Sequence, residues 1–139
     1  MAIPQAIPLY DALQNIHEIK VKLAATDGAL TKNVFSTSGA IQDIKLDTIR
    51  AAIGLVFTFL VQNLSAIKTT DPIAMAYPDI HHNLMDHTTR RNWLLNGYGT
   101  PAKIKWSEVA DSIYNDVPTI ENGIIAALKA LGYENPSGG

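Results

Sequence analysis

The chain has 139 residues, a length at which one domain can bury a core without disulfides or structural metals. Hydrophobic residues make up 47% and charged residues 17%, against about 25% charged in an ordinary soluble domain. A net charge of −2 excludes a globally basic nucleic-acid binder, and the lack of cysteine excludes disulfides, thiolate metal sites and cysteine nucleophiles. The shortage of charge favours a surface that contacts another chain.

The first residues predict an extended arm that leads into a helix. Residues 1–8 carry two prolines, Pro4 and Pro8, which disfavour helix in the residues before them. From Leu9 to Leu23 the apolar residues recur at the spacing of one helical face. Thr26-Asp27-Gly28 predicts the end of this helix. Residues 29–39 are rich in serine, threonine and glycine and predict a loop, in which Val34 and Phe35 turn inward.

The strongest predicted helix runs over residues 41–68. In its first half the charged residues are free to face water, and its second half is apolar all round, which indicates burial by its own chain or by a neighbouring subunit. The apolar part, residues 51–64, is shorter than the roughly 20 residues that span a bilayer, so we expect no membrane span. One helical stripe contains Ile41, Ile44, Thr48, Ala52, Leu55, Phe59 and Gln62.

The second half of the chain predicts three more helical stretches. Residues 69–78 contain Asp-Pro and Tyr-Pro pairs and predict a connection, after which Asp79 caps a helix over residues 80–95. Another helix starts near Thr100-Pro101, and Pro118 breaks or restarts it. The last helix covers residues 119–131, with Gly132 at its C′ position.

This layout predicts an all-α fold, a bundle of four to five helices with an extended N-terminal arm. We expect a single helical domain over residues 1–139, with the arm at 1–8 and a tail at 133–139.

The one candidate metal site is a histidine group, His81, His82 and His87, with Asp79 and Asp86 nearby. On a helix, His82 and Asp86 share a face, but a usable site would need further ligands such as His17 or Glu18. No HExxH and no Glu-x-x-His pattern occurs. We therefore expect no metal and no other cofactor, with these histidines on the surface of a helix start. A metal-binding enzyme or sensor is the alternative.

Nothing in the sequence predicts catalysis. There is no G-x-S-x-G, no P-loop and no G-x-G-x-x-G, so we expect a protein that is not an enzyme.

Charge divides unevenly along the second half of the chain. Residues 88–106 carry four basic side chains, no acid and three aromatic rings, whereas residues 107–139 carry five acids and one lysine. The two segments could pair within the fold, the basic one could hold phosphates, or the basic surface of one copy could meet the acidic surface of the next. We favour contact between copies, because the chain is apolar and slightly negative.

A cysteine-free, charge-poor helical bundle with an arm at residues 1–8 and a long apolar helix at 41–68 resembles virion structural proteins. More specifically, it is similar in architecture to the major coat proteins of filamentous archaeal viruses, and a bacteriophage head, neck or tail component fits almost as well. The resemblance implies a subunit that stacks with copies of itself, or with a related coat subunit, into a helical filament around double-stranded DNA. Its location would then be the virion, assembled in the host cytoplasm; otherwise the protein would be cytoplasmic.

The resemblance also suggests which residues make contacts. Phosphate contacts would fall on Lys20, Lys22, Lys45, Arg50, Arg90 and Arg91. Contacts between subunits would fall on Ile3, Pro4, Ile7, Pro8, Leu55, Phe57, Phe59, Trp93 and Trp106. A monomeric adaptor that binds a partner helix on the apolar strip of the long helix is a further alternative.

Overall fold

The computed structural model describes residues 6–97 and 104–133, and within these ranges the chain is helical with no β-strand. This confirms the predicted all-α bundle. The long helices are α1 (Ala6–Ala24), α3 (Ile44–Ser65) and α5 (Leu84–Gly97), followed by a continuous run of α6 (Trp106–Ala110), η3 (Asp111–Asp116) and α7 (Val117–Ala130).

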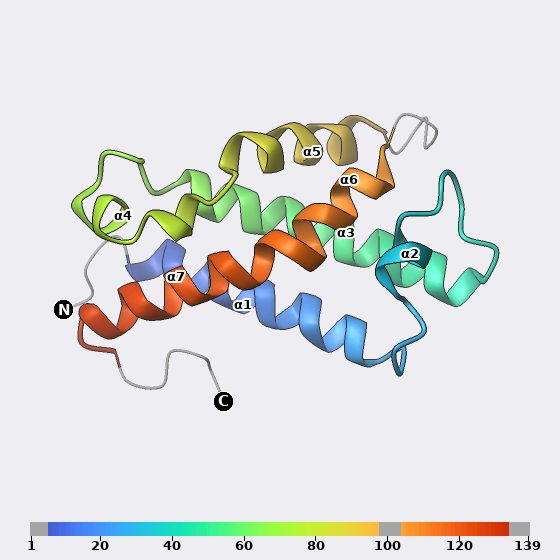
Figure 1. Cartoon of the computed structure of the whole chain (residues 1–139), viewed down its shortest axis with the longest axis horizontal. Coiled ribbons are helices and arrows are strands. Elements are labelled where there is room, and N and C mark those ends of the chain that lie inside the picture. Colours follow the sequence, from blue (N-terminus) through green and yellow to red (C-terminus); the bar gives the residue numbers. More distant parts are fainter. Residues whose placement is uncertain (1–5, 98–103, 134–139) are drawn as a thin grey trace.

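Helix α3 lies between α1 and α5 and runs antiparallel to both (Figure 1). The run from α6 to α7 crosses the bundle, and α7 packs against α1 and against η1 (Pro78–His81), a short 3₁₀ helix. The core is continuous through all the long helices. Within residues 6–97 and 104–133, no helix is long and apolar enough to cross a membrane.

The N-terminal arm was predicted to be extended over residues 1–8, and this is wrong for residues 6–8, because α1 already begins at Ala6. Pro8 falls in the first turn of the helix, where backbone N–H groups have no partner within the helix, so its missing N–H costs nothing there. Residues 1–5 lie outside the described part of the chain. The predicted stop after this helix is confirmed, since Asp27 and Gly28 have positive φ angles of 52° and 82°.

The predicted loop at 29–39 contains a short helix, α2 (Lys32–Phe35), capped by the Thr31 side chain. Phe35 is fully buried, as predicted, and Val34 is half-buried.

Helix α3 is three residues shorter at each end than predicted. Asp43 caps its start by accepting a hydrogen bond from the Leu46 amide. The residues predicted to share one stripe do share a face, but from Ile44 onward this face points outward. The opposite side of α3 carries the larger buried set, which includes Ile53, Phe57, Leu60 and Leu64. Packing on that side therefore decides how the helix is turned.

The connection predicted over residues 69–78 contains a further short helix, α4 (Pro72–Ala76), which the Asp71 side chain caps at the Ile73 amide. The helix predicted over 80–95 is split. Asp79 lies inside η1, where its side chain makes no capping hydrogen bond. Asn83, with a positive φ of 56°, changes the direction of the chain before α5 begins.

Of the two predicted outcomes at Pro118, a break or a restart of the helix, the structure has the restart. The backbone widens into the π-helical turn η3 just before it, and Pro118 then occupies the first turn of α7. Gly132 has the expected C′ conformation, with a φ of 94°. Tyr133, predicted as the start of the tail, packs its ring edge-on against Tyr10 at 5.0 Å between centroids. Residues 134–139 lie outside the described part.

Candidate self-association surface

An outward-facing row of uncharged side chains runs along the whole of α3. Ile44 is 81% exposed, and Leu55 and Phe59, one turn apart, are 46% and 48% exposed. These residues recur every three or four positions and so share one helical face. The row, called the α3 stripe below, consists of the exposed Ile44, Thr48, Leu55, Phe59 and Gln62, of Ala51, which is half-buried at the edge of the cavity described below, and of Ala66, the C-cap residue.

The neighbours of α3 explain why the stripe is left uncovered. On one flank, the Asn63 side chain donates a hydrogen bond of 2.7 Å to Asn15 of α1. On the other flank, Gly54 faces Leu94 of α5, and the Phe57 ring meets the His87 ring edge-on at 5.9 Å. Helices α1 and α5 therefore cover the two sides of α3, and the face between them stays open.

A hollow lies beside Phe59, between α1 and α3. Its walls are mostly polar: Asp11, Gln14, Asn15, Gln62 and Asn63. Phe59 thus presents an apolar ring at the edge of a polar groove, an arrangement typical of the boundary between the core and the rim of an interface.

The residues predicted to form the subunit interface divide into exposed and buried ones. Leu55, Phe59 and Ile7 are exposed, whereas Pro8 and Trp93 are half-buried. The prediction is wrong for Phe57 and Trp106, which are core residues, because they lie on the covered sides of their helices. Ile3 and Pro4 lie outside the described residues.

The residues predicted to contact phosphate also divide into exposed and buried ones. Lys45 is exposed and Lys22 is half-buried, while the Lys20 ammonium pairs with Glu121 of α7 at 2.6 Å. Arg91 is half-buried, with its Nη2 on Asn92. The prediction is wrong for Arg50, whose side chain is only 2% exposed and points into the protein.

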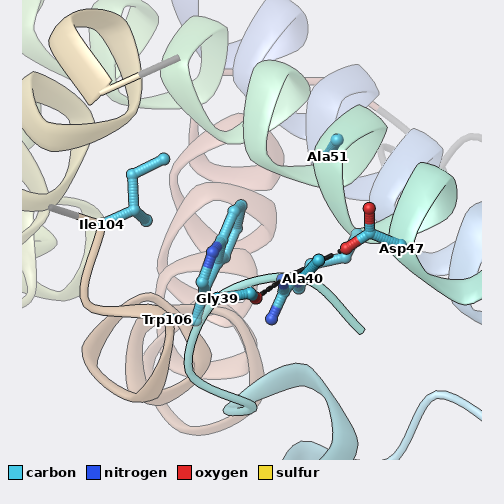
Figure 2. A pocket seen from close by; sticks show the side chains of 7 residues that line it. Gly39, Ala40, Asp47, Ala51, Ile104 and Trp106 are labelled. Atoms are coloured by element: carbon cyan, nitrogen blue, oxygen red, sulfur yellow. Dashed lines mark hydrogen bonds and ion pairs between the residues drawn. The ribbon is translucent and has the colours of Figure 1, made fainter. Parts of the chain in front are cut away.

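Arg50 instead fixes the loop that follows α2. Its guanidinium donates to the carbonyl oxygens of Phe35 at 3.0 Å and Thr37 at 2.7 Å and also to that of Gly39, and it pairs with Asp47 at 3.3 Å. Burial lowers the pKa of Arg50, and the charge of Asp47 opposes this. With Trp106 and Ile104, Arg50 lines a cavity of about 170 Å³ (Figure 2). The two terminal nitrogens of the guanidinium are occupied by the protein's own acceptors, whereas Nε has no hydrogen-bond partner among the described residues, and the walls of the cavity are mainly apolar.

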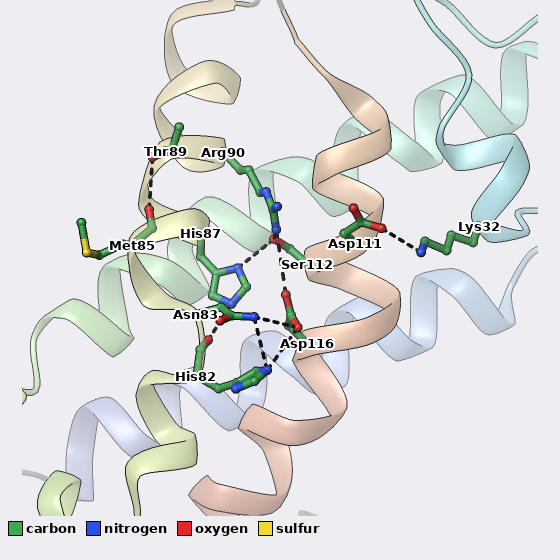
Figure 3. A network of polar contacts seen from close by, with 10 residues as sticks. All are labelled: Lys32, His82, Asn83, Met85, His87, Thr89, Arg90, Asp111, Ser112 and Asp116. Carbon is green, nitrogen blue, oxygen red and sulfur yellow. Dashed lines mark hydrogen bonds and ion pairs between the residues drawn. The ribbon is translucent and has the colours of Figure 1, made fainter.

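A second polar cluster joins α5 to η3 (Figure 3). The Arg90 Nη1 lies 2.8 Å from Ser112 Oγ, which lies 2.8 Å from His87 Nδ1, and His87 Nε2 lies 2.8 Å from the His82 carbonyl oxygen. Because the His82 carbonyl oxygen can only accept, His87 Nε2 carries a proton. In the neutral ring Nδ1 is then an acceptor, so the Ser112 hydroxyl donates to Nδ1 while its oxygen accepts from Arg90. Burial lowers the pKa of His87, which agrees with this assignment.

Ser112 and His87 are both buried, so the serine hydroxyl has no path to a substrate in this conformation. The arrangement acts as a bridge between two helices.

The Asp116 carboxylate, at the end of η3, makes polar contacts with residues that precede it in the chain. It lies 3.2 Å from His82 Nε2, 3.2 Å from the Asn83 amide and 3.9 Å from Arg90. Lys105 pairs with Glu108 at 3.9 Å. Two members of the basic segment therefore pair with the acidic segment within the fold, as one of the three interpretations of the charge layout expects.

The candidate metal ligands are directed to separate partners. His81 Nε2 lies 2.9 Å from the Leu64 carbonyl oxygen, His82 faces Asp116, and His87 is buried against Ser112. In the described part of the chain, no group of three or more such side chains is placed to hold a metal ion. The expectation that all three histidines lie on the surface is wrong for His87.

Sequence reasoning missed Ser112 and Asn83. Ser112 lies on the buried side of the π-helical turn η3, and no local sequence pattern predicts such a turn. Asn83 does belong to the small set of residues that tolerate positive φ.

Comparison with known proteins adds no relative: no family model, curated protein or solved structure matches this chain.

Proposed function

We propose that the protein is a non-enzymatic structural subunit that assembles with copies of itself through the α3 stripe. The observation that carries this proposal is the exposure of Leu55 and Phe59, 46% and 48%, on a stripe of the longest helix that contains no charged residue. Covering both half-exposed side chains would contribute about 2 kcal/mol per copy. An exposed helix face is ordinarily polar or charged, so an uncharged one favours a contact.

A copy of the chain is a better occupant than an unrelated helix. It brings the same stripe, so no charged residue of the stripe itself is buried against Leu55 and Phe59. The low charged fraction of the chain, 17%, points the same way.

The finer form of the proposal is a virion coat subunit that forms a filament around DNA. It is supported by the architectural resemblance and by Lys22 and Lys45, which remain candidates for phosphate contact, whereas Lys20 pairs with Glu121. With two such contacts per subunit, the logarithm of the binding constant should fall against the logarithm of the salt concentration with a slope of about −2. Binding that is absent or insensitive to salt would remove DNA from the proposal.

Size-exclusion chromatography with light scattering tests the assembly itself. The wild-type chain, 15.1 kDa as a monomer, should run at a multiple of this mass at micromolar concentration. The double variant L55Q/F59Q should shift toward the monomer with an unchanged helical circular dichroism spectrum. Met85 on α5 is 86% exposed, so M85Q is a matched control that should leave the mass unchanged. A wild-type chain that stays monomeric contradicts the proposal, and the adaptor alternative would then be preferred.

A further inference from the structure

The α3 stripe is complementary to itself when it is reversed. From the sizes and polarities of its residues we infer that two copies pair their α3 helices antiparallel, across a two-fold axis that passes at Leu55. The inference rests on the proposed function and specifies which partner the stripe takes and in which register.

Large and small residues alternate about Leu55 in a way that fits this symmetry. A two-fold axis at position 55 places each residue opposite the one equally far away on the other side. Phe59 then faces Ala51, four positions away on either side, and Ile44 faces Ala66, eleven positions away. Each bulky side chain meets an alanine, the alternation that close helix packing requires.

The polar members of the stripe also lie opposite each other in this arrangement. Thr48 and Gln62 are each seven positions from Leu55 and therefore face one another. Within its own helix the Thr48 hydroxyl already donates to the Ile44 carbonyl oxygen at 2.9 Å. Its free lone pair can accept a hydrogen bond from the Gln62 amide, so the polar groups of the contact are matched as well.

The parallel arrangement fits less well. Parallel helices in the same register would place Phe59 against Phe59 and Ala51 against Ala51. The two phenylalanine rings would then be crowded, and the two alanines would leave a gap. Antiparallel helices also place opposite ends of their dipoles together.

This geometry limits what the contact can build. A two-fold contact uses the same surface on both partners and closes on itself, so the α3 stripe gives a dimer. A filament would need a second, different surface, and the dimer would be its repeating unit.

The absence of cysteine from the chain makes disulfide trapping a clean test. In the L55C variant the two new thiols meet at the axis and should form a linked dimer under mild oxidation. In A51C the thiols of the two copies are eight positions apart along the helices, about 12 Å, too far for a disulfide. The L55C link should form roughly a hundredfold faster than that of A51C or of the exposed control M85C, since the contact holds its thiols at high effective concentration.

An exchange of charges tests the register without oxidation. T48E and Q62K each place a charge opposite a neutral side chain and should raise the dimer dissociation constant, measured by sedimentation equilibrium. The double variant T48E/Q62K places a carboxylate opposite an ammonium twice per dimer and should recover the wild-type value to within about threefold. A double variant weaker than both single variants overturns the register.

The outcomes separate this inference from the function on which it rests. If the wild-type chain is oligomeric but L55C links no faster than A51C and M85C, the two-fold contact is wrong and self-assembly stands. If the wild-type chain is monomeric, the inference and the proposed function fall together.

Discussion

The guanidinium of Arg50 lies over the indole ring of Trp106, with 4.1 Å between its central carbon and the ring centroid. Together with the carbonyl acceptors at 35, 37 and 39, this contact joins three parts of the chain, namely the loop after α2, helix α3 and the start of α6. One buried cation therefore holds together an end of the bundle where apolar packing is interrupted by the cavity.

Replacing Arg50 should lower the stability of the fold. In R50M the carbonyl acceptors lose their donor, and hydrogen bonds from a charged group contribute more than neutral ones, so we expect a loss of about 3 kcal/mol in the free energy of unfolding. R50K keeps the charge but offers a single donor centre, which cannot replace the fork of Arg50, and should recover less than half of this loss. Urea unfolding followed by circular dichroism measures both variants. Equal stability of R50M and the wild type would show that the carbonyl contacts contribute little.

Stability should decrease in mild acid because of His87. Its folded pKa is lowered by burial, with Arg90 acting in the same direction and Asp116 and Asp86 opposing. Below about pH 6.5, the ordinary histidine pKa, the unfolded chain binds a proton that the folded chain does not. The contribution of His87 is therefore present above that pH and lost as the pH falls toward the folded pKa, by at most about 1.4 kcal/mol per pH unit.

The H87Q variant, which keeps a donor and an acceptor, should show a flatter pH dependence of the urea midpoint between pH 7.5 and 5. H17Q replaces an exposed histidine and should leave the wild-type slope unchanged. A slope that survives in H87Q would place its origin in other groups.

Removal of the Ser112 hydroxyl should break the bridge between α5 and η3. In S112A the buried Nδ1 of His87 loses its hydrogen-bond donor, which costs about 1–3 kcal/mol. S107A, an exposed serine on α6, serves as the control in the same denaturation assay. In the wild type, nitrogen NMR of the His87 ring should show a neutral ring protonated at Nε2, and the opposite tautomer would refute the assigned direction of the bridge.

Gly123 should not tolerate alanine, although alanine favours a helix by about 1 kcal/mol over glycine. A Cβ at this position would lie 2.9 Å from the backbone nitrogen of Ile80, so α7 and η1 would have to move apart. We expect G123A to lose about 1–3 kcal/mol in unfolding free energy. At Gly54 the nearest atom is the tip of the Leu94 side chain at 3.2 Å, which can shift, so G54A should lose less. A more stable G123A would mean that the two helices are less tightly packed.

Several features follow from the sequence because their causes are local. The stop at Asp27-Gly28 and the one at Gly132 depend on the few residues that accept positive φ. Five members of the α3 stripe, Ile44, Thr48, Leu55, Phe59 and Gln62, follow from helical spacing, whereas Ala52 was predicted on that face in place of Ala51.

Other features depend on contacts that no local pattern contains. The outward direction of the α3 stripe is decided by where α1 and α5 pack, because α3 is apolar on both sides. The burial of Arg50 depends on carbonyl groups 11 to 15 positions earlier, in a loop that is also held by the packing of Phe35 against Trp106. Among the candidate sites, helical spacing places Leu55 and Phe59 on one face of α3, whereas their exposure and the burial of Arg50 both depend on how the other elements pack.

The pairing of Lys20 on α1 with Glu121 on α7 spans 101 positions of the chain, and the bond from the Tyr114 hydroxyl to the Leu30 carbonyl spans 84. Helices α1 and α7 thus pack against each other and together cover part of the core. During synthesis, α1 and α3 can meet as a hairpin while the ribosome still holds the remainder. The side of α1 that α7 covers stays open to water until α7 itself emerges.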